Sequence, residues 1–382
     1  MCSHARLRSV PGAVSETTDR EYDREAEPGV DDSAGPFEID RSRLVGFAGL
    51  VALWLVTILG GMALADEVAA TGAVLFEDPD EVGNVGIFGV YVLVATGVML
   101  LGFRYARLVH LRVVGAAVFG LFAGTFVAIA TGVGSVAGGG ALTGLPTSPV
   151  PIAVGLVVAA VLFVYPEWYV VDLVAVALGA VTIPMLGLGF GPLPIVVLLV
   201  VWAAYDAYSV YVSGHMKELA TGAGDLKLPI LYVVPHSLSY SLVGDGLELG
   251  LDEDDPNESG DSAAERSADS PPNRSAEDSE ASAKAGPSVQ LLGLGDAIIP
   301  GMLAVSAGTF LDAPAVVPAL NANLPALGAI AGGFLGMGAL LVLLHRVEGA
   351  HAGLPPLNAG VLLGYLAGAV AAGVPVATAL GL

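Results

Sequence analysis

The sequence predicts an all-α polytopic membrane protein. Of its 382 residues, 54% are hydrophobic and only 14% are charged, and the mean hydropathy is +0.74. About a quarter of the residues of a soluble domain are charged. The charges are also unevenly placed, since residues 1–43 and 244–288 hold 32 of the 52 Asp, Glu, Lys and Arg residues. Most of the remaining chain is therefore apolar enough to lie in lipid.

Residues 1–43 contain ten acidic residues and six arginines among Pro, Gly and Ser. They include no apolar run that could serve as the hydrophobic region of a signal peptide. Such a composition cannot bury enough apolar surface to fold, so we expect a disordered acidic tail.

Nine apolar stretches follow the tail, each close to the roughly 20 residues that a helix needs to cross the hydrocarbon core. Six of them fall within residues 44–213 and three within residues 289–382. The predicted spans are 44–65, 82–103, 113–133, 149–165, 168–189, 191–213, 289–311, 324–344 and 354–380.

A polar segment, residues 214–288, separates the sixth and seventh spans. From about Gly244 it carries 13 acidic residues with Ser, Ala, Pro and Asn, so we expect a disordered loop. Before it, Leu228–Val234 is a β-favouring run that is too short to cross a membrane.

The basic residues predict the orientation, because positively charged loops stay on the cytoplasmic side. With nine spans, all 15 Lys and Arg residues fall on one side, together with the amino terminus. We therefore expect the amino terminus in the cytoplasm and the carboxyl terminus outside. The opposite loops carry only acidic residues, namely Asp66, Glu67, Glu77, Asp78, Asp80, Glu81 and Asp312.

The formal net charge of −22 makes nucleic acid a poor partner. An acidic chain with only three lysines is typical of a halophilic protein, although acidic disordered segments give the same balance. Cys2 is the only cysteine, which excludes an internal disulfide, and the sequence shows no cluster of Cys and His ligands. We expect no metal site and no cofactor.

Three acidic residues fall inside predicted spans, where a charge is costly and usually marks function. Asp172 lies one turn into the fifth predicted span, after the interfacial anchors Trp168 and Tyr169, and the helix dipole there favours a carboxylate. This position explains Asp172 without a catalytic role. Asp206 and Asp296 lie deeper, each seven residues from the inner end of its predicted span.

Asp206 and Asp296 are expected at the same depth in two antiparallel neighbours, about 10 Å below the inner surface. No Lys, Arg or His lies at that depth in any predicted span. Two acids without a cation between them must share protons, as the dyad of an aspartic protease does. Two readings stay open: unrelated acids that each face a polar cavity, and an ion-coupled transporter with paired carboxylates.

The residues around the two acids favour the protease interpretation over the other two. Asp206 stands in Ala204-Tyr205-Asp206-Ala207-Tyr208, and Asp296 ends the run Leu292-Gly293-Leu294-Gly295-Asp296. Tyr-Asp in one span and Gly-Leu-Gly-Asp in the next resemble the presenilin and signal peptide peptidase family of intramembrane aspartyl proteases (GxGD type), particularly its archaeal presenilin-like members. The resemblance covers residues 44–380.

The family's third motif is Pro-Ala-Leu at the inner start of its ninth helix. Literal copies begin at Pro318 and Pro325, but both fall on the outer side of the predicted topology and are interpreted as coincidences. The segment in the matching place is Ala352–Leu357, which has Gly in place of Ala and a shifted first Pro.

The resemblance implies hydrolysis of peptide bonds within transmembrane protein substrates in the lipid bilayer, by Asp206 and Asp296. The basic residues match the orientation of the presenilin-like members, with the amino terminus inside, so we expect single-span substrates with their amino terminus outside. The resemblance leaves homo-oligomer formation open. The supporting motif residues are Tyr205, Gly293, Leu294, Gly295, Gly353, Leu354 and Pro355. The residues expected either to bind substrate or to belong to a buried strand without a substrate role are Leu228, Pro229, Ile230 and Leu231.

Pro300 lies four residues after Asp296 and has no N–H to donate to the Asp296 carbonyl. We expect a helix kink at this acid and an exposed backbone acceptor.

Overall fold

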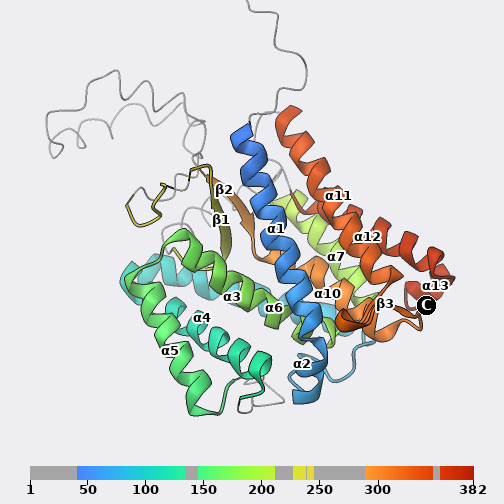
Figure 1. Cartoon of the computed structure of the whole chain (residues 1–382), viewed down its shortest axis with the longest axis horizontal. Helices are drawn as coiled ribbons and strands as arrows, with labels where there is room; N and C mark the ends of the chain where they lie inside the picture. Colours follow the sequence, from blue (N-terminus) through green and yellow to red (C-terminus); the bar gives the residue numbers. More distant parts are fainter. Residues whose placement is uncertain (1–40, 134–144, 211–226, 238, 245–288, 347–352) are drawn as a thin grey trace, which may run out of the picture. The chain divides into compact units, whose positions relative to one another are not determined.

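The computed structural model describes residues 41–133, 145–210, 227–237, 239–244, 289–346 and 353–382 (Figure 1). Almost all of the predicted acidic tail, and the predicted disordered loop beyond Gly244, lie outside these residues. Residues from Arg41 onward form one unit, and most of the described residues in it are helical.

In the part of the chain that the structure describes, nine apolar helices follow the predicted spans in order. Six of them are long and apolar enough to cross a membrane, and α5, α7 and α10 are shorter. The number that crosses the membrane, and the direction of the termini, stay predictions. The helices are α1 (Arg41–Ala63), α3 (Gly83–Tyr105), α4 (Leu108–Thr131), α5 (Pro149–Val164), α6 (Trp168–Gly187), α7 (Pro192–Tyr208), α10 (Gly295–Phe310), α11 (Leu324–Arg346) and α12 (Leu354–Ala371).

Proline and glycine mark several helix ends. Pro149 and Pro192 stand in the first turns of α5 and α7, where a missing N–H costs no helical hydrogen bond. Gly132 ends α4 with φ 63°, a left-handed conformation that glycine adopts without strain. A short helix, α2 (Ala65–Thr71), follows α1.

The predicted span 289–311 is wrong at its start. Val289–Gly293 forms strand β2, which pairs antiparallel with β1 (Leu231–Pro235), and α10 begins only at Gly295. Val289–Leu292 therefore forms backbone hydrogen bonds with a strand from the first part of the 214–288 segment. The pairing joins Leu231 to Gly293 and Pro235 to Val289.

The predicted span 354–380 is not one helix. Helix α12 ends at Ala371, Gly373 has φ 74°, and Pro375 precedes a separate short helix, α13 (Val376–Ala379). A left-handed glycine followed by a proline stops a helix, which explains the break.

Two buried acids hold strand β1 and the residues that follow it in the sequence. Asp172 of α6 accepts a 2.8 Å hydrogen bond from the Val233 amide. Glu167, just before α6, accepts hydrogen bonds from the Ser241 hydroxyl at 2.7 Å and the Leu242 amide at 3.0 Å. Strand β1 and the residues after it are thereby fixed to the start of α6.

The largest hydrophobic cluster lies among α1, α6, α7, α10, α11 and α12. Helices α11 and α12 approach so closely that a Cβ on Gly332 or Gly360 would collide with the carbonyl oxygen of the other glycine. Gly328 and Gly364 are related in the same way. Small residues at such spacing let two membrane helices pack backbone against backbone.

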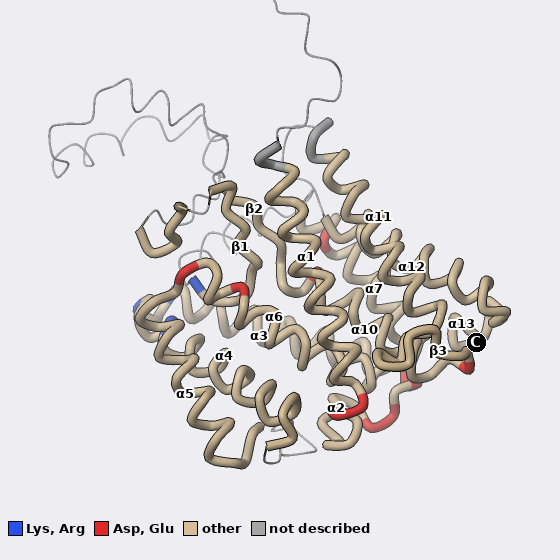
Figure 2. Tube along the Cα trace, viewed as in Figure 1, with Lys and Arg blue, Asp and Glu red and all other residues tan. Residues whose placement is uncertain are grey.

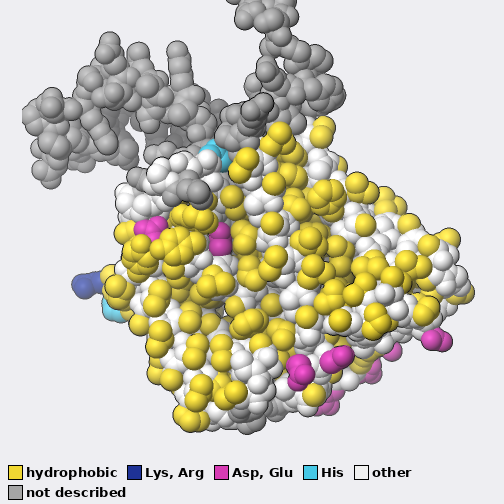
Figure 3. Space-filling model, in the orientation of Figure 1, with side chains coloured by type: hydrophobic (Ala, Val, Ile, Leu, Met, Phe, Trp, Pro, Cys, Tyr) yellow, Lys and Arg dark blue, Asp and Glu magenta, His cyan; other side chains and the backbone are white. Residues whose placement is uncertain are grey.

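The surface separates apolar from acidic regions. Hydrophobic side chains cover most of the face seen in Figure 3, as expected for a surface that meets lipid. The acidic residues of α2 and of the stretch after it lie at one end of α1, and strands β1 and β2 lie at its other end (Figure 2). On that side lie also the strands β3 (Ala315–Val317) and β4 (Ala322–Asn323), with the turn η4 (Pro318–Leu320) between them.

Candidate active site

Asp206 is the third residue from the end of α7, and its side chain is buried, with 7% exposed. Its Oδ2 accepts a 3.0 Å hydrogen bond from the Leu354 amide, and the Gly353 amide also bonds to this carboxyl. Two backbone N–H groups at the start of α12 therefore hold the carboxyl of Asp206. Such donors stabilise an ionised carboxylate.

Asp296 is the second residue of α10, and its side chain is partly exposed. The Gly293 amide donates to its carboxyl, and the charges of the Asp206 and Asp296 carboxyls interact. A Cβ on Gly293 would lie 3.2 Å from Asp296 Oδ2, so a larger residue there would crowd the acid. A Cβ on Gly295 would meet no atom within 4 Å, which leaves open space beside the acid.

The sequence predicts both acids seven residues inside their spans, whereas Asp296 lies at the start of α10 in the structure. The predicted inner end of the span that holds Asp206, residues 211–213, lies outside the described residues. For Asp296 the difference arises because β2 replaces the first part of the predicted span. The two acids still come from neighbouring helices, since α7 packs against α10.

The motif residues predicted to support the site divide into two groups. Gly293, Gly353 and Leu354 contact the acids through their backbone amides, and Pro355 stands in the first turn of α12. Tyr205 does not contact Asp206 in any described interaction: its ring is 51% exposed and lies 6.4 Å from the Trp202 ring.

The predicted substrate-binding segment lies against the glycine motif. The Leu294 amide donates to the Ile230 carbonyl at 3.0 Å, and Leu231 pairs with Gly293. Leu228 is buried, and its side chain would meet a Cβ added to Gly115 of α4. The segment therefore supports the strand that leads into Asp296.

Sequence reasoning missed one contact of the site. The Trp54 Nε1–H of α1 donates to the Asp296 carbonyl at 3.3 Å. The sequence predicted a free acceptor at this carbonyl because of Pro300, but it gave no sign of which donor would fill it. The third membrane acid, Asp172, bonds to Val233 and takes no part in the pair.

Comparisons with known proteins agree with this geometry. A sequence model of the family described as signal-peptide peptidase, presenilin aspartyl protease matches residues 51–374. One solved structure of a presenilin family intramembrane aspartate protease, in space group C222, is 26% identical with a TM-score of 0.53, over 86% of this chain and 100% of that chain. A structure in space group P2 is 26% identical with a TM-score of 0.52, over 85% and 97%. No curated protein matches the chain.

The fold defines a multi-pass helical membrane protein in which Asp206 and Asp296 lie on two helices that pack together. The match over most of its length shows that the chain belongs to the signal-peptide peptidase and presenilin family of aspartyl proteases. It is an integral membrane protein with a presenilin-like fold.

Proposed function

We propose that the protein is an intramembrane endopeptidase in which Asp206 and Asp296 form the catalytic dyad. The observation that carries this proposal is the position of two acids on the packed helices α7 and α10, 90 positions apart in the sequence and near enough for their charges to interact. Two backbone amides bond to the Asp206 carboxyl and one bonds to the Asp296 carboxyl. Of the three membrane acids, these are the two that interact with each other.

The dyad works with one proton shared between its two carboxyls. The ionised carboxyl takes a proton from a water molecule, and the resulting hydroxide attacks the carbonyl carbon of the scissile peptide bond. The protonated carboxyl donates its proton to the carbonyl oxygen. Collapse of the tetrahedral intermediate then breaks the C–N bond, and a proton passes to the leaving amine. The two roles belong to the pair and not to a fixed residue.

The substrate of such a site is a transmembrane segment of another membrane protein. The amides of a membrane helix are hidden in internal hydrogen bonds, so the segment must unwind before cleavage. An unwound segment gains hydrogen bonds by adding a strand to a sheet edge. The Val233 amide of β1 already bonds to Asp172, so the substrate strand is placed beside β2, which leads directly to Asp296. Leu228, Pro229, Ile230 and Leu231 then support β2 from behind.

The test is cleavage of a generic single-span substrate by purified protein in detergent or liposomes. Asp206→Asn and Asp296→Asn, and the corresponding Ala variants, are expected to abolish cleavage and to leave insertion and thermal unfolding close to wild type. Asp172→Asn is the matched control, because it removes a membrane acid outside the pair. Clear residual cleavage by either dyad variant would refute the assignment.

A further inference from the structure

The backbone hydrogen bonds of α10 are interrupted near its start, at the Asp296 carbonyl. In an unbroken helix the Asp296 carbonyl would accept the amide of residue 300, but Pro300 has no N–H. A backbone carbonyl left without a donor in a dry interior costs free energy. This carbonyl is instead bonded by the Trp54 Nε1–H, from a residue 242 positions earlier.

Trp54 is held where it can make this bond. Its side chain is 1% exposed, and the indole N–H is a donor that needs an acceptor when it is buried. A Cβ on Gly333 of α11 would lie 2.7 Å from the Cη2 and Cζ2 atoms of the indole, so the ring packs directly on the α11 backbone.

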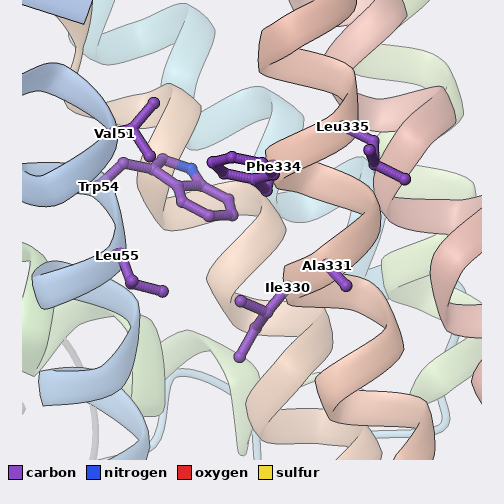
Figure 4. A pocket seen from close by; sticks show the side chains of 7 residues that line it. All are labelled: Val51, Trp54, Leu55, Ile330, Ala331, Phe334 and Leu335. Carbon is purple, nitrogen blue, oxygen red and sulfur yellow. The ribbon is translucent and has the colours of Figure 1, made fainter. Parts of the chain in front are cut away.

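One edge of the indole lines an apolar pocket of about 380 Å³ between α1 and α11. Figure 4 shows Trp54 reaching from α1 toward Phe334 of α11, with Val51 and Leu55 on its own helix. The indole therefore contacts apolar side chains over much of its surface, while its N–H meets a polar atom at the active site.

We infer that Trp54 is a positioning residue for Asp296. It supplies the donor that Pro300 lacks and so fixes the peptide group of the acid whose side chain carries the chemistry. Small displacements of a reacting group lower the rate steeply, by about a hundredfold for 1 Å. The inference rests on the proposed function of Asp296 and adds a residue outside the family motifs of the site.

A double-mutant cycle between Trp54 and Pro300 tests the inference. Trp54→Phe keeps an aromatic ring and removes the N–H, so kcat should fall about three- to tenfold with KM within about twofold, as for a single long hydrogen bond. Pro300→Ala restores an amide that can bond to the Asp296 carbonyl. In the Pro300→Ala background, Trp54→Phe should therefore change kcat less than about twofold.

A purely structural tryptophan would give a different pattern. The loss in kcat would then be the same in both backgrounds, or it would follow the loss in thermal stability, and either result would overturn the inference. Cleavage by Asp296→Asn in the same assay would instead refute the proposed function, so the two failures are distinguishable.

A substitution at Gly333 tests the same inference without changing Trp54 or Pro300. Gly333→Ala should push the indole away from Asp296 and lower kcat at least about threefold. Gly338→Ala is the matched control on the same helix, because a Cβ there meets no atom within 4 Å. Equal kcat in the two alanine variants would contradict a positioning role for Trp54.

Discussion

The amide of Leu354, the first residue of α12, donates a 3.0 Å hydrogen bond to the carboxyl of Asp206, 148 residues earlier in the chain. This contact joins the variant third motif to the first catalytic candidate. The departure of Ala352–Leu357 from the literal Pro-Ala-Leu therefore does not remove the contact, because the backbone N–H makes it.

Pro355 follows this donor and fixes the backbone of the first turn of α12. Pro355→Ala should lower kcat several-fold, because the Leu354 amide loses its fixed direction toward Asp206. The free energy of unfolding should change by only about 1 kcal/mol or less. Kinetics and thermal melts of Pro355→Ala and of the control Pro356→Ala provide the comparison. A wild-type kcat in Pro355→Ala would show that Ala352–Leu357 only starts a helix and has no role in catalysis.

For Asp172 we predict a role in stability and not in catalysis. Its carboxyl accepts the Val233 amide in a buried position, so Asp172→Leu should leave that N–H unpaired and destabilise the protein by about 1–3 kcal/mol. Asp172→Asn keeps an acceptor oxygen and should retain both stability and cleavage within about twofold. Thermal unfolding and initial rates of both variants are the measurement. Loss of cleavage in a folded Asp172→Asn protein would place Asp172 in the chemistry.

The rate of cleavage should depend on pH with a bell shape, because one proton must sit on the pair. At low pH both carboxyls are protonated and no base is present. At high pH both are ionised and no acid is present. The measurement is kcat/KM from about pH 4 to about pH 9, with return to neutral pH as a control for irreversible unfolding. A flat profile over that range would contradict the shared-proton mechanism.

Substrate orientation is the fourth prediction, and it depends on the distribution of the 15 basic residues. Addition of a strand is directional, so one orientation of a transmembrane segment should be cut in preference to the other. We expect preference for an amino terminus outside and a carboxyl terminus inside.

The experiment offers one segment in both orientations, set by swapped Lys/Arg clusters, in cells that express the protein. A tag within residues 244–288 reports the side of the loop and serves as the topology control. Preferential cleavage of the reversed substrate, or an external tag, would contradict the predicted orientation.

The helices of this protein could be predicted because each is a long apolar run bounded by polar or helix-breaking residues. The span that begins at residue 289 shows the limit of this method. Val289–Leu292 has three apolar residues in four and leads into an apolar helix, but it pairs with Leu231–Pro235 and forms a strand. Hydropathy reports the medium around a segment and not its backbone partner.

The candidate site, too, could be predicted only in part from the sequence. Asp206 and Asp296 could be selected because an acid in lipid is rare and costly. The role of Asp172 depends on the amide of Val233, and the role of Trp54 depends on a carbonyl in α10. Both partners are backbone groups far away in the sequence. The types of the two bonded residues therefore do not indicate that they are paired.

The close packing of α11 on α12 also constrains how the site can open. Gly328, Gly332, Gly360 and Gly364 leave no side chains between the two backbones that could slide or re-pack. If α12 moved as a rigid body, α11 would move with it, so a displacement that breaks the Leu354–Asp206 bond would also change the packing of Gly333 on Trp54. A single displacement of this helical pair would then act on Asp206 through its hydrogen-bond donor and on Asp296 through Trp54, so the two catalytic candidates would respond to one motion.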